Sequence, residues 1–202
     1  DDVMDEVREQ AERDYQLASG LSQDVESDDN VFRQTTARLP WLLIGMLGGI
    51  GNSMILGNFD STFAAHPEMA LYIPLIGGTG GNVGTQSSAL VVQGLANSSL
   101  NAENTLKQVM KESVVALINA TIISMLVYIY NFIRFGASAT VSYSVSISLF
   151  AVVMFASIFG TLVPMTLEKL KIDPAIATGP FISITNDIIG MLLYMGITVM
   201  LS

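Results

Sequence analysis

Apolar residues fill five long runs along the chain, separated by short polar segments. The runs cover residues 40–59, 70–96, 113–133, 145–167 and 180–201. Each run is close to the ~20 residues that a helix needs to cross the hydrocarbon core of a bilayer. The pattern therefore predicts an all-α membrane protein with five transmembrane helices per chain.

The first 37 residues follow a different pattern. Apolar positions recur there every three or four residues beside an acidic stripe, which is typical of an amphipathic helix outside the bilayer. The apolar positions are Met4, Val7, Ala11, Tyr15 and Ala18, and the acidic ones are Asp2, Asp5, Glu9 and Glu12. A polar linker follows over residues 19–34. We therefore divide the chain into an acidic cytoplasmic helix with its linker, residues 1–37, and a five-helix transmembrane domain, residues 38–202.

Composition supports a membrane environment. The chain is 50% hydrophobic and only 13% charged, and its mean hydropathy of +0.51 is too high for an ordinary soluble domain. The net charge is −9, but eleven of the eighteen acidic residues lie between Asp1 and Asp29. The acidity thus belongs to the segment outside the bilayer. We expect the lipid bilayer as a partner and no nucleic acid.

Basic residues predict the orientation of the chain. A cytoplasmic N-terminus places eight of the nine basic residues on the cytoplasmic side and leaves Arg134 outside, as the positive-inside rule favours. The expected location is the plasma membrane, with multiple spans and an extracytoplasmic C-terminus. No signal-peptide pattern precedes the first span. Because the chain begins within the acidic helical pattern, we also expect an upstream domain.

Asp187 is the only deeply buried charge that we predict. It lies inside the last apolar run, where an aspartate costs ~2.5–3.5 kcal/mol on insertion scales. Helical spacing places Ser183 and Asn186 on the same side. No basic residue lies within any predicted span, so a permeating cation can supply the missing positive charge. This favours an ion site over the structural alternative, an aspartate that joins helices through hydrogen bonds.

The second apolar run is rich in glycine. Five glycines occur within residues 77–84, and Asn82 and Thr85 add an amide and a hydroxyl group. One interpretation is a loosened helix whose backbone borders a water-filled path. The other is close helix packing through the small-residue spacing of Gly77 with Gly81 and of Gly80 with Gly84. The two interpretations are compatible.

The available ligands limit the choice of ion. The chain has no cysteine and a single histidine, His66, in a predicted loop, so we expect neither a thiolate site nor an enzyme. Carboxylate, amide and hydroxyl oxygens suit hard cations such as Mg²⁺, Ca²⁺ or Mn²⁺. Mg²⁺ commonly uses one or two carboxylates and retained waters. Because five helices make a thin wall around a hydrated ion, we predict a homodimer with two-fold symmetry.

Three segments resemble the MgtE family of magnesium channels and transporters. They are RLPWLL at residues 38–43, IPLIGGTGGNVGTQ at residues 73–86 and DPAIATGPFISITND at residues 173–187. The resemblance implies a homodimer of five-span chains with the ion path along the two-fold axis. It further implies that Asp187 binds magnesium, that Asn82 and backbone near Gly81 border the pore, and that Ser183 faces the ion. We add Asn186 as a candidate ligand from its helical position.

The resemblance also implies regulation by domains that precede the membrane part. In that family an N domain and a pair of CBS domains precede a plug helix, and residues 1–17 are similar to the end of the CBS region and that helix. Magnesium is then the transported and a regulatory ion. Three alternatives stay open: an efflux or exchange carrier on the same scaffold, a transporter with broader divalent selectivity (Mn, Co or Ca), and a scaffold that transports nothing.

Overall fold

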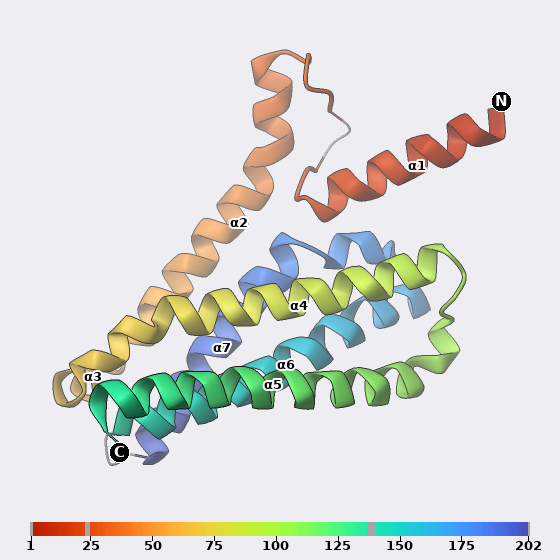
Figure 1. The fold of residues 1–202 in the computed structure, drawn as a ribbon. Helices are drawn as coiled ribbons and strands as arrows, with labels where there is room; N and C mark the ends of the chain where they lie inside the picture. The colour runs from red at the N-terminus through yellow and green to blue at the C-terminus, as the bar shows by residue number, and fades with distance from the viewer. Residues whose placement is uncertain (1, 23–24, 137–139, 202) are drawn as a thin grey trace.

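The computed structural model describes residues 2–22, 25–136 and 140–201, and within these ranges it contains helices and turns but no strand. Figure 1 shows their arrangement. The order is α1 (Asp2–Ala18), α2 (Val31–Gly57), α3 (Asp60–Ala65), η1 (Pro67–Tyr72), α4 (Ile73–Ala96), η2 (Ala102–Asn104), α5 (Thr105–Phe135), α6 (Thr140–Lys169), η3 (Pro174–Ala177) and α7 (Pro180–Leu201), where η marks a 3-10 helix. The all-α prediction is confirmed for these residues.

Four of the described helices, α2, α5, α6 and α7, are long and apolar enough to cross a membrane. Helix α4 has 24 residues, which correspond to about 36 Å of helix. It carries no charged side chain but is rich in glycine, amide and hydroxyl residues, and it is not among the four helices that meet this criterion. The fifth span therefore remains a prediction for α4.

Helix α6 lies at the centre of the bundle and packs against α4, α5 and α7. Figure 1 shows α6 running behind and between α4 and α5, which both pack on it. The core contains Ile76 from α4, Leu149 and Val152 from α6, and Tyr194 from α7, all of them buried. The Tyr194 hydroxyl donates a hydrogen bond of 2.8 Å to the carbonyl oxygen of Met69, which joins α7 to η1.

Glycines on α4 and α6 bring helix backbones into direct contact. A Cβ on Gly160 would collide with the carbonyl oxygen of Gly84, and one on Gly80 would lie only 2.9 Å from Cγ1 of Val152. Helix α4 nevertheless continues without interruption through the glycine-rich run. The close-packing interpretation is thus confirmed for Gly80 and Gly84, because side chains at these positions would push the helices apart.

Helix α2 projects from the bundle (Figure 1) and packs chiefly against α7. Apolar side chains such as Leu42, Leu47 and Met54 are exposed along it. The helix begins at Val31, where the Asn30 side chain caps it by accepting a hydrogen bond of 2.9 Å from the backbone N–H of Arg33. The predicted domain boundary between residues 37 and 38 therefore lies inside one continuous helix.

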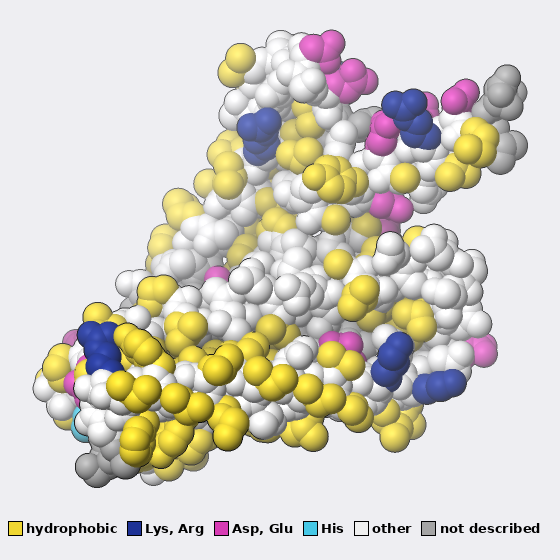
Figure 2. Space-filling model, in the orientation of Figure 1, with side chains coloured by type: hydrophobic (Ala, Val, Ile, Leu, Met, Phe, Trp, Pro, Cys, Tyr) yellow, Lys and Arg dark blue, Asp and Glu magenta, His cyan; other side chains and the backbone are white. Residues whose placement is uncertain are grey.

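The C-terminal end of α1 packs against the segment that leads into α7. Gly179 has a φ of +53°, and a Cβ there would collide with the carbonyl oxygen of Ala18. Glycine is required at this position for both reasons. Figure 2 shows that charged side chains gather over α1 and at the ends of the bundle, whereas hydrophobic side chains line the exposed face of α5. This distribution matches that of a protein embedded in lipid.

Candidate functional site

A cavity of about 350 Å³ lies where α4 and α7 face each other beside α2. The glycines of α4 create the space on one wall. A Cβ at Gly77 would lie 3.3 Å from Oδ1 of Asp187, and a Cβ at Gly81 would lie 3.7 Å from the same oxygen. The half-buried carboxyl group of Asp187 therefore lies against Gly77 and Gly81 on one face of α4.

Four of the five predicted site residues line this cavity. They are Gly81 and Asn82 from α4 and Ser183 and Asp187 from α7. Ser183 and Asp187 are four residues apart and therefore lie on the same helical face. The Ser183 hydroxyl is 3.3 Å from the hydroxyl of Thr85 on the facing helix. These four residues thus contribute one carboxylate, one amide and one hydroxyl group to the cavity.

Asn186 lies apart from these four residues. Its side chain is only 1% exposed and packs against Gly84 of α4. Within the described ranges, neither its Oδ1 nor its Nδ2 atom has a hydrogen-bond partner. Asn186 is not among the residues that line the cavity, so its role as an ion ligand stays a prediction.

Sequence reasoning missed Asn52 on α2. This residue lines the same cavity, and its Oδ1 atom is buried without a hydrogen-bond partner among the described residues. An unpaired buried acceptor normally costs about 1–3 kcal/mol. The available signal was a single amide in the middle of the first apolar run, at a position where the sequence offers no packing reason for it.

The charge of Asp187 is uncompensated within the described part of the chain. No lysine, arginine or histidine there forms an ion pair with it. No group of three or more histidine, cysteine or acidic residues that could enclose a metal occurs in the same part. A single carboxylate beside neutral oxygen groups fits a hard cation that keeps most of its waters, and Mg²⁺ is the ion that loses water most reluctantly.

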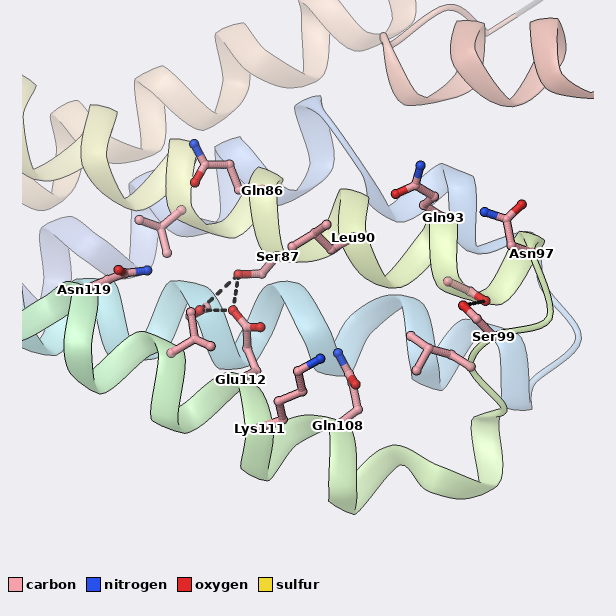
Figure 3. Close-up of a pocket in the computed structure, with 15 residues that line it drawn as sticks. Gln86, Ser87, Leu90, Gln93, Asn97, Ser99, Gln108, Lys111, Glu112 and Asn119 are labelled. Carbon is pink, nitrogen blue, oxygen red and sulfur yellow. Dashed lines mark hydrogen bonds between the residues drawn. The ribbon is translucent and has the colours of Figure 1, made fainter.

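The prediction that Asp187 is the only deeply buried charge is wrong. Glu112 on α5 is 8% exposed, and the hydroxyl groups of Ser87 and Ser157 both donate hydrogen bonds to its Oε1 atom, as Figure 3 shows. Helix α5 begins at Thr105, eight residues before the predicted span. The predicted span begins at residue 113, so Glu112 fell in the polar segment that precedes it.

Comparison with known proteins identifies the family. Residues 73–197 match the family model described as "MgtE: Divalent cation transporter". The chain belongs to the MgtE family. The matched region begins at the first residue of α4 and ends near the C-terminus of α7, so it contains Asp187, Asn82 and the glycine-rich run. The family resemblance inferred from the sequence motifs is confirmed.

Three curated relatives extend the similarity to nearly the whole chain, and all three are named "Magnesium transporter MgtE". The protein from Bacillus subtilis (strain 168) is 32% identical over 197 residues, which are 98% of this chain and 44% of the relative. That from Enterococcus faecalis is 29% identical over 99% of this chain, and that from Thermus thermophilus is 30% identical over 98%. The chain spans 44% of the length of each relative. These MgtE relatives are named as ion transporters, not as enzymes.

Proposed function

We propose that this chain forms the membrane-embedded part of a magnesium transporter and that the ion passes through the cavity between α4 and α7. The observation that carries the proposal is the placement of Asp187 opposite Gly77 and Gly81 in a cavity that Asn82 and Ser183 also line. The carboxylate attracts the cation. The glycines leave space for its water shell.

The transport mechanism follows from the chemistry of these groups. Asp187 supplies negative charge at a depth where bulk water is absent, and the Asn82 amide and the Ser183 hydroxyl hydrogen-bond to waters that the ion retains. An inward electrical gradient drives the movement, because each elementary charge that crosses 100 mV contributes ~2.3 kcal/mol. Each chain contributes a single carboxylate, and contact through retained waters holds the divalent ion loosely enough for release.

Two copies of the chain complete the proposed path. A homodimer would place two Asp187 carboxylates around one two-fold axis and would balance the charge of one Mg²⁺ ion. The exposed apolar length of α2 is surface that a second copy and lipid would cover. In this arrangement α4 is the fifth span of each chain. The N-terminus is cytoplasmic and the C-terminus extracytoplasmic, and the protein resides in the plasma membrane.

A regulatory role for magnesium belongs to the same proposal and rests on α1. Its residues Glu6 and Asp14 line a second cavity together with Glu168 from the last turn of α6 and Asp173 from the connection between α6 and α7. Burial and, to a lesser extent, the nearby Asp173 carboxylate raise the pKa of Asp14. A divalent cation between Asp14 and Asp173 would relieve the repulsion of these two carboxylates and hold α1 in place. Domains upstream of α1 would then control the path.

Magnesium uptake into proteoliposomes at a defined membrane potential tests the proposal. We expect wild-type full-length protein to take up Mg²⁺ and the Asp187→Asn variant to fall to the level of protein-free vesicles. Asp60→Asn, which changes an exposed acid on α3, is the matched control and should transport normally. Equal uptake by the Asp187→Asn variant, with both proteins folded as dimers, would refute the path.

The same vesicles distinguish a channel from a coupled carrier. A channel responds only to the Mg²⁺ gradient and the membrane potential. An exchanger on this scaffold would need a sodium or proton gradient, so uptake that disappears when those gradients are collapsed would replace the channel mechanism with exchange. Competition by Mn²⁺, Co²⁺ and Ca²⁺ in this assay measures the selectivity.

A further inference from the structure

A third cavity, of about 430 Å³, lies between α4, α5 and α6 on the side of α4 away from Asp187. Helix α5 packs against α6 and makes little direct contact with α4, so a gap is left between them. Five amide side chains line it, and Lys111 and Glu112 supply one positive and one negative charge. Figure 3 shows Gln108, Lys111 and Glu112 extending from α5 toward α4, whereas Gln86 and Gln93 extend from α4 away from α5. Nothing in the proposed ion path uses them.

Hydrogen bonds to one oxygen of its carboxyl group hold Glu112 in one orientation. Hydroxyls of Ser87 and Ser157 both bind Oε1, whereas Oε2 receives no hydrogen bond from any described residue. Figure 3 shows Oε2 pointing away from the two hydroxyls and toward the open part of the cavity. Lys111 forms no ion pair with Glu112 among the described residues. Each of the two charges is therefore available to a ligand.

The charged residues of α5 indicate where this cavity lies relative to the bilayer. Lys111 and Arg134 are separated by 23 residues of continuous helix, which correspond to about 34 Å and match the ~30 Å hydrocarbon core. Lys111 and Glu112 therefore lie at the level of the lipid headgroups. Val114, Leu117 and Ile118 follow on α5 with exposed side chains, which gives the surface next to the cavity an apolar character (Figure 2).

We propose that the cavity binds a zwitterionic headgroup that carries a primary ammonium and a phosphate group, as an amino-phospholipid does. Oε2 of Glu112 accepts hydrogen bonds from the ammonium, and the Lys111 ammonium binds the phosphate. The acyl chains then lie along the apolar face of α5. A divalent cation alone fits the cavity less well because Lys111 would repel it, and an anionic headgroup would face the Glu112 carboxylate.

Native mass spectrometry of the delipidated full-length protein tests this inference. The probes are phosphatidylethanolamine, phosphatidylcholine and phosphatidylglycerol with identical acyl chains, and soluble phosphoethanolamine. We expect phosphatidylethanolamine to bind at least roughly tenfold more tightly than the other two lipids, because only its headgroup offers an N–H donor to Glu112 and a phosphate to Lys111. Soluble phosphoethanolamine should bind far more weakly, since it lacks the chains that contact α5.

Two pairs of variants identify the groups responsible. Glu112→Gln keeps an acceptor for the two serines but removes the charge, and Lys111→Gln removes the charge of an exposed residue. Each should weaken phosphatidylethanolamine binding roughly tenfold. Glu103→Gln and Lys107→Gln alter exposed charges nearby and should leave binding unchanged. Equal binding of the three lipids, or unchanged binding by both cavity variants, would overturn the proposal. Tight binding of soluble phosphoethanolamine would show that the ligand need not be a lipid and would overturn the proposal.

Discussion

Asp187 and Glu112 are two carboxylates that face α4 from opposite sides, and their surroundings differ. Asp187 is half-buried, lies against glycines and receives no hydrogen bond from any described residue. Glu112 is more deeply buried, but two serine hydroxyls fix one of its oxygens. The first carboxylate is open to a mobile cation. The second is anchored to two other helices.

The difference shows that depth alone does not identify an ion site in a membrane protein. A permeating ion needs acceptor oxygens that the protein has left unpaired, and it needs space for its waters. Asp187 meets both conditions because Gly77 and Gly81 carry no side chains. Glu112 meets the first condition with only one oxygen, and Lys111 beside it opposes a free cation.

The largest effect on stability is expected at the contact of α6 with α4, the helix that lines both the Asp187 cavity and the Glu112 cavity. Gly160→Ala would force α6 away from the Gly84 carbonyl, and overpacking of this kind costs about 1–3 kcal/mol of unfolding free energy. Gly196→Ala is the matched control, since a Cβ there meets nothing within 4 Å. Thermal unfolding in detergent should distinguish the two variants. Equal stabilities would show that α4 and α6 do not need this close approach.

A pair of substitutions at Glu112 tests whether it anchors helices. Glu112→Leu leaves the Ser87 and Ser157 hydroxyls buried without their acceptor, which costs about 1–3 kcal/mol of unfolding free energy. Glu112→Gln retains an acceptor oxygen and should cost less. Denaturation curves measure both. If the leucine variant is as stable as wild type, the hydroxyl contacts contribute nothing, and the contrast with Asp187 disappears.

Asn52 is expected to separate function from stability. Asn52→Leu removes a buried acceptor that has no partner among the described residues, so the free energy of unfolding should stay constant or rise by up to about 1 kcal/mol. Magnesium uptake should fall several-fold, because the cavity loses an oxygen that can bind the hydrated ion. Parallel unfolding and flux assays measure the two effects. Loss of stability with normal uptake would assign Asn52 to packing.

The smallest effect concerns the packing of α1 against η3. Burial and the neighbouring Asp173 raise the pKa of Asp14, so the packed state binds the proton more tightly than the free helix does. Packing is therefore favoured below the ordinary aspartate pKa and weakens as pH rises through the raised value. Limited proteolysis of the linker after α1 across this pH range measures the change. Asp14→Asn should remove the pH dependence, and a persistent dependence would point to another acid.

Much of this arrangement could be predicted because periodicity and polarity carry the information. The apolar runs correspond to α2, α4, α5, α6 and α7. Helical spacing alone placed Ser183 on the face of Asp187. The family motif pointed to Gly81 and Asn82, and all four residues line one cavity.

The remaining features depend on tertiary contacts that periodicity does not encode. Glu112 was missed because a charge beside Lys111 is typical of a loop, and only Ser87 and Ser157 from two other helices explain its burial. Asn186 was grouped with Asp187, but adjacent helical residues point about 100° apart. The packing of α7 on α4 turns Asp187 toward the cavity and Asn186 toward Gly84. Helix α2 begins nine residues before its apolar run, since polar residues can form a helix outside the bilayer.

Thiol labelling tests most directly whether the ion passes between α4 and α7. The chain contains no cysteine, so Asn82→Cys and Ser183→Cys each introduce a single thiol into it, and Leu192→Cys provides an exposed control on α7. We predict that a water-soluble thiol reagent labels the two cavity positions, that Mg²⁺ protects them, and that Asp187→Asn abolishes the protection. Labelling that Mg²⁺ does not slow, or protection that persists without the Asp187 carboxylate, would contradict the proposed path.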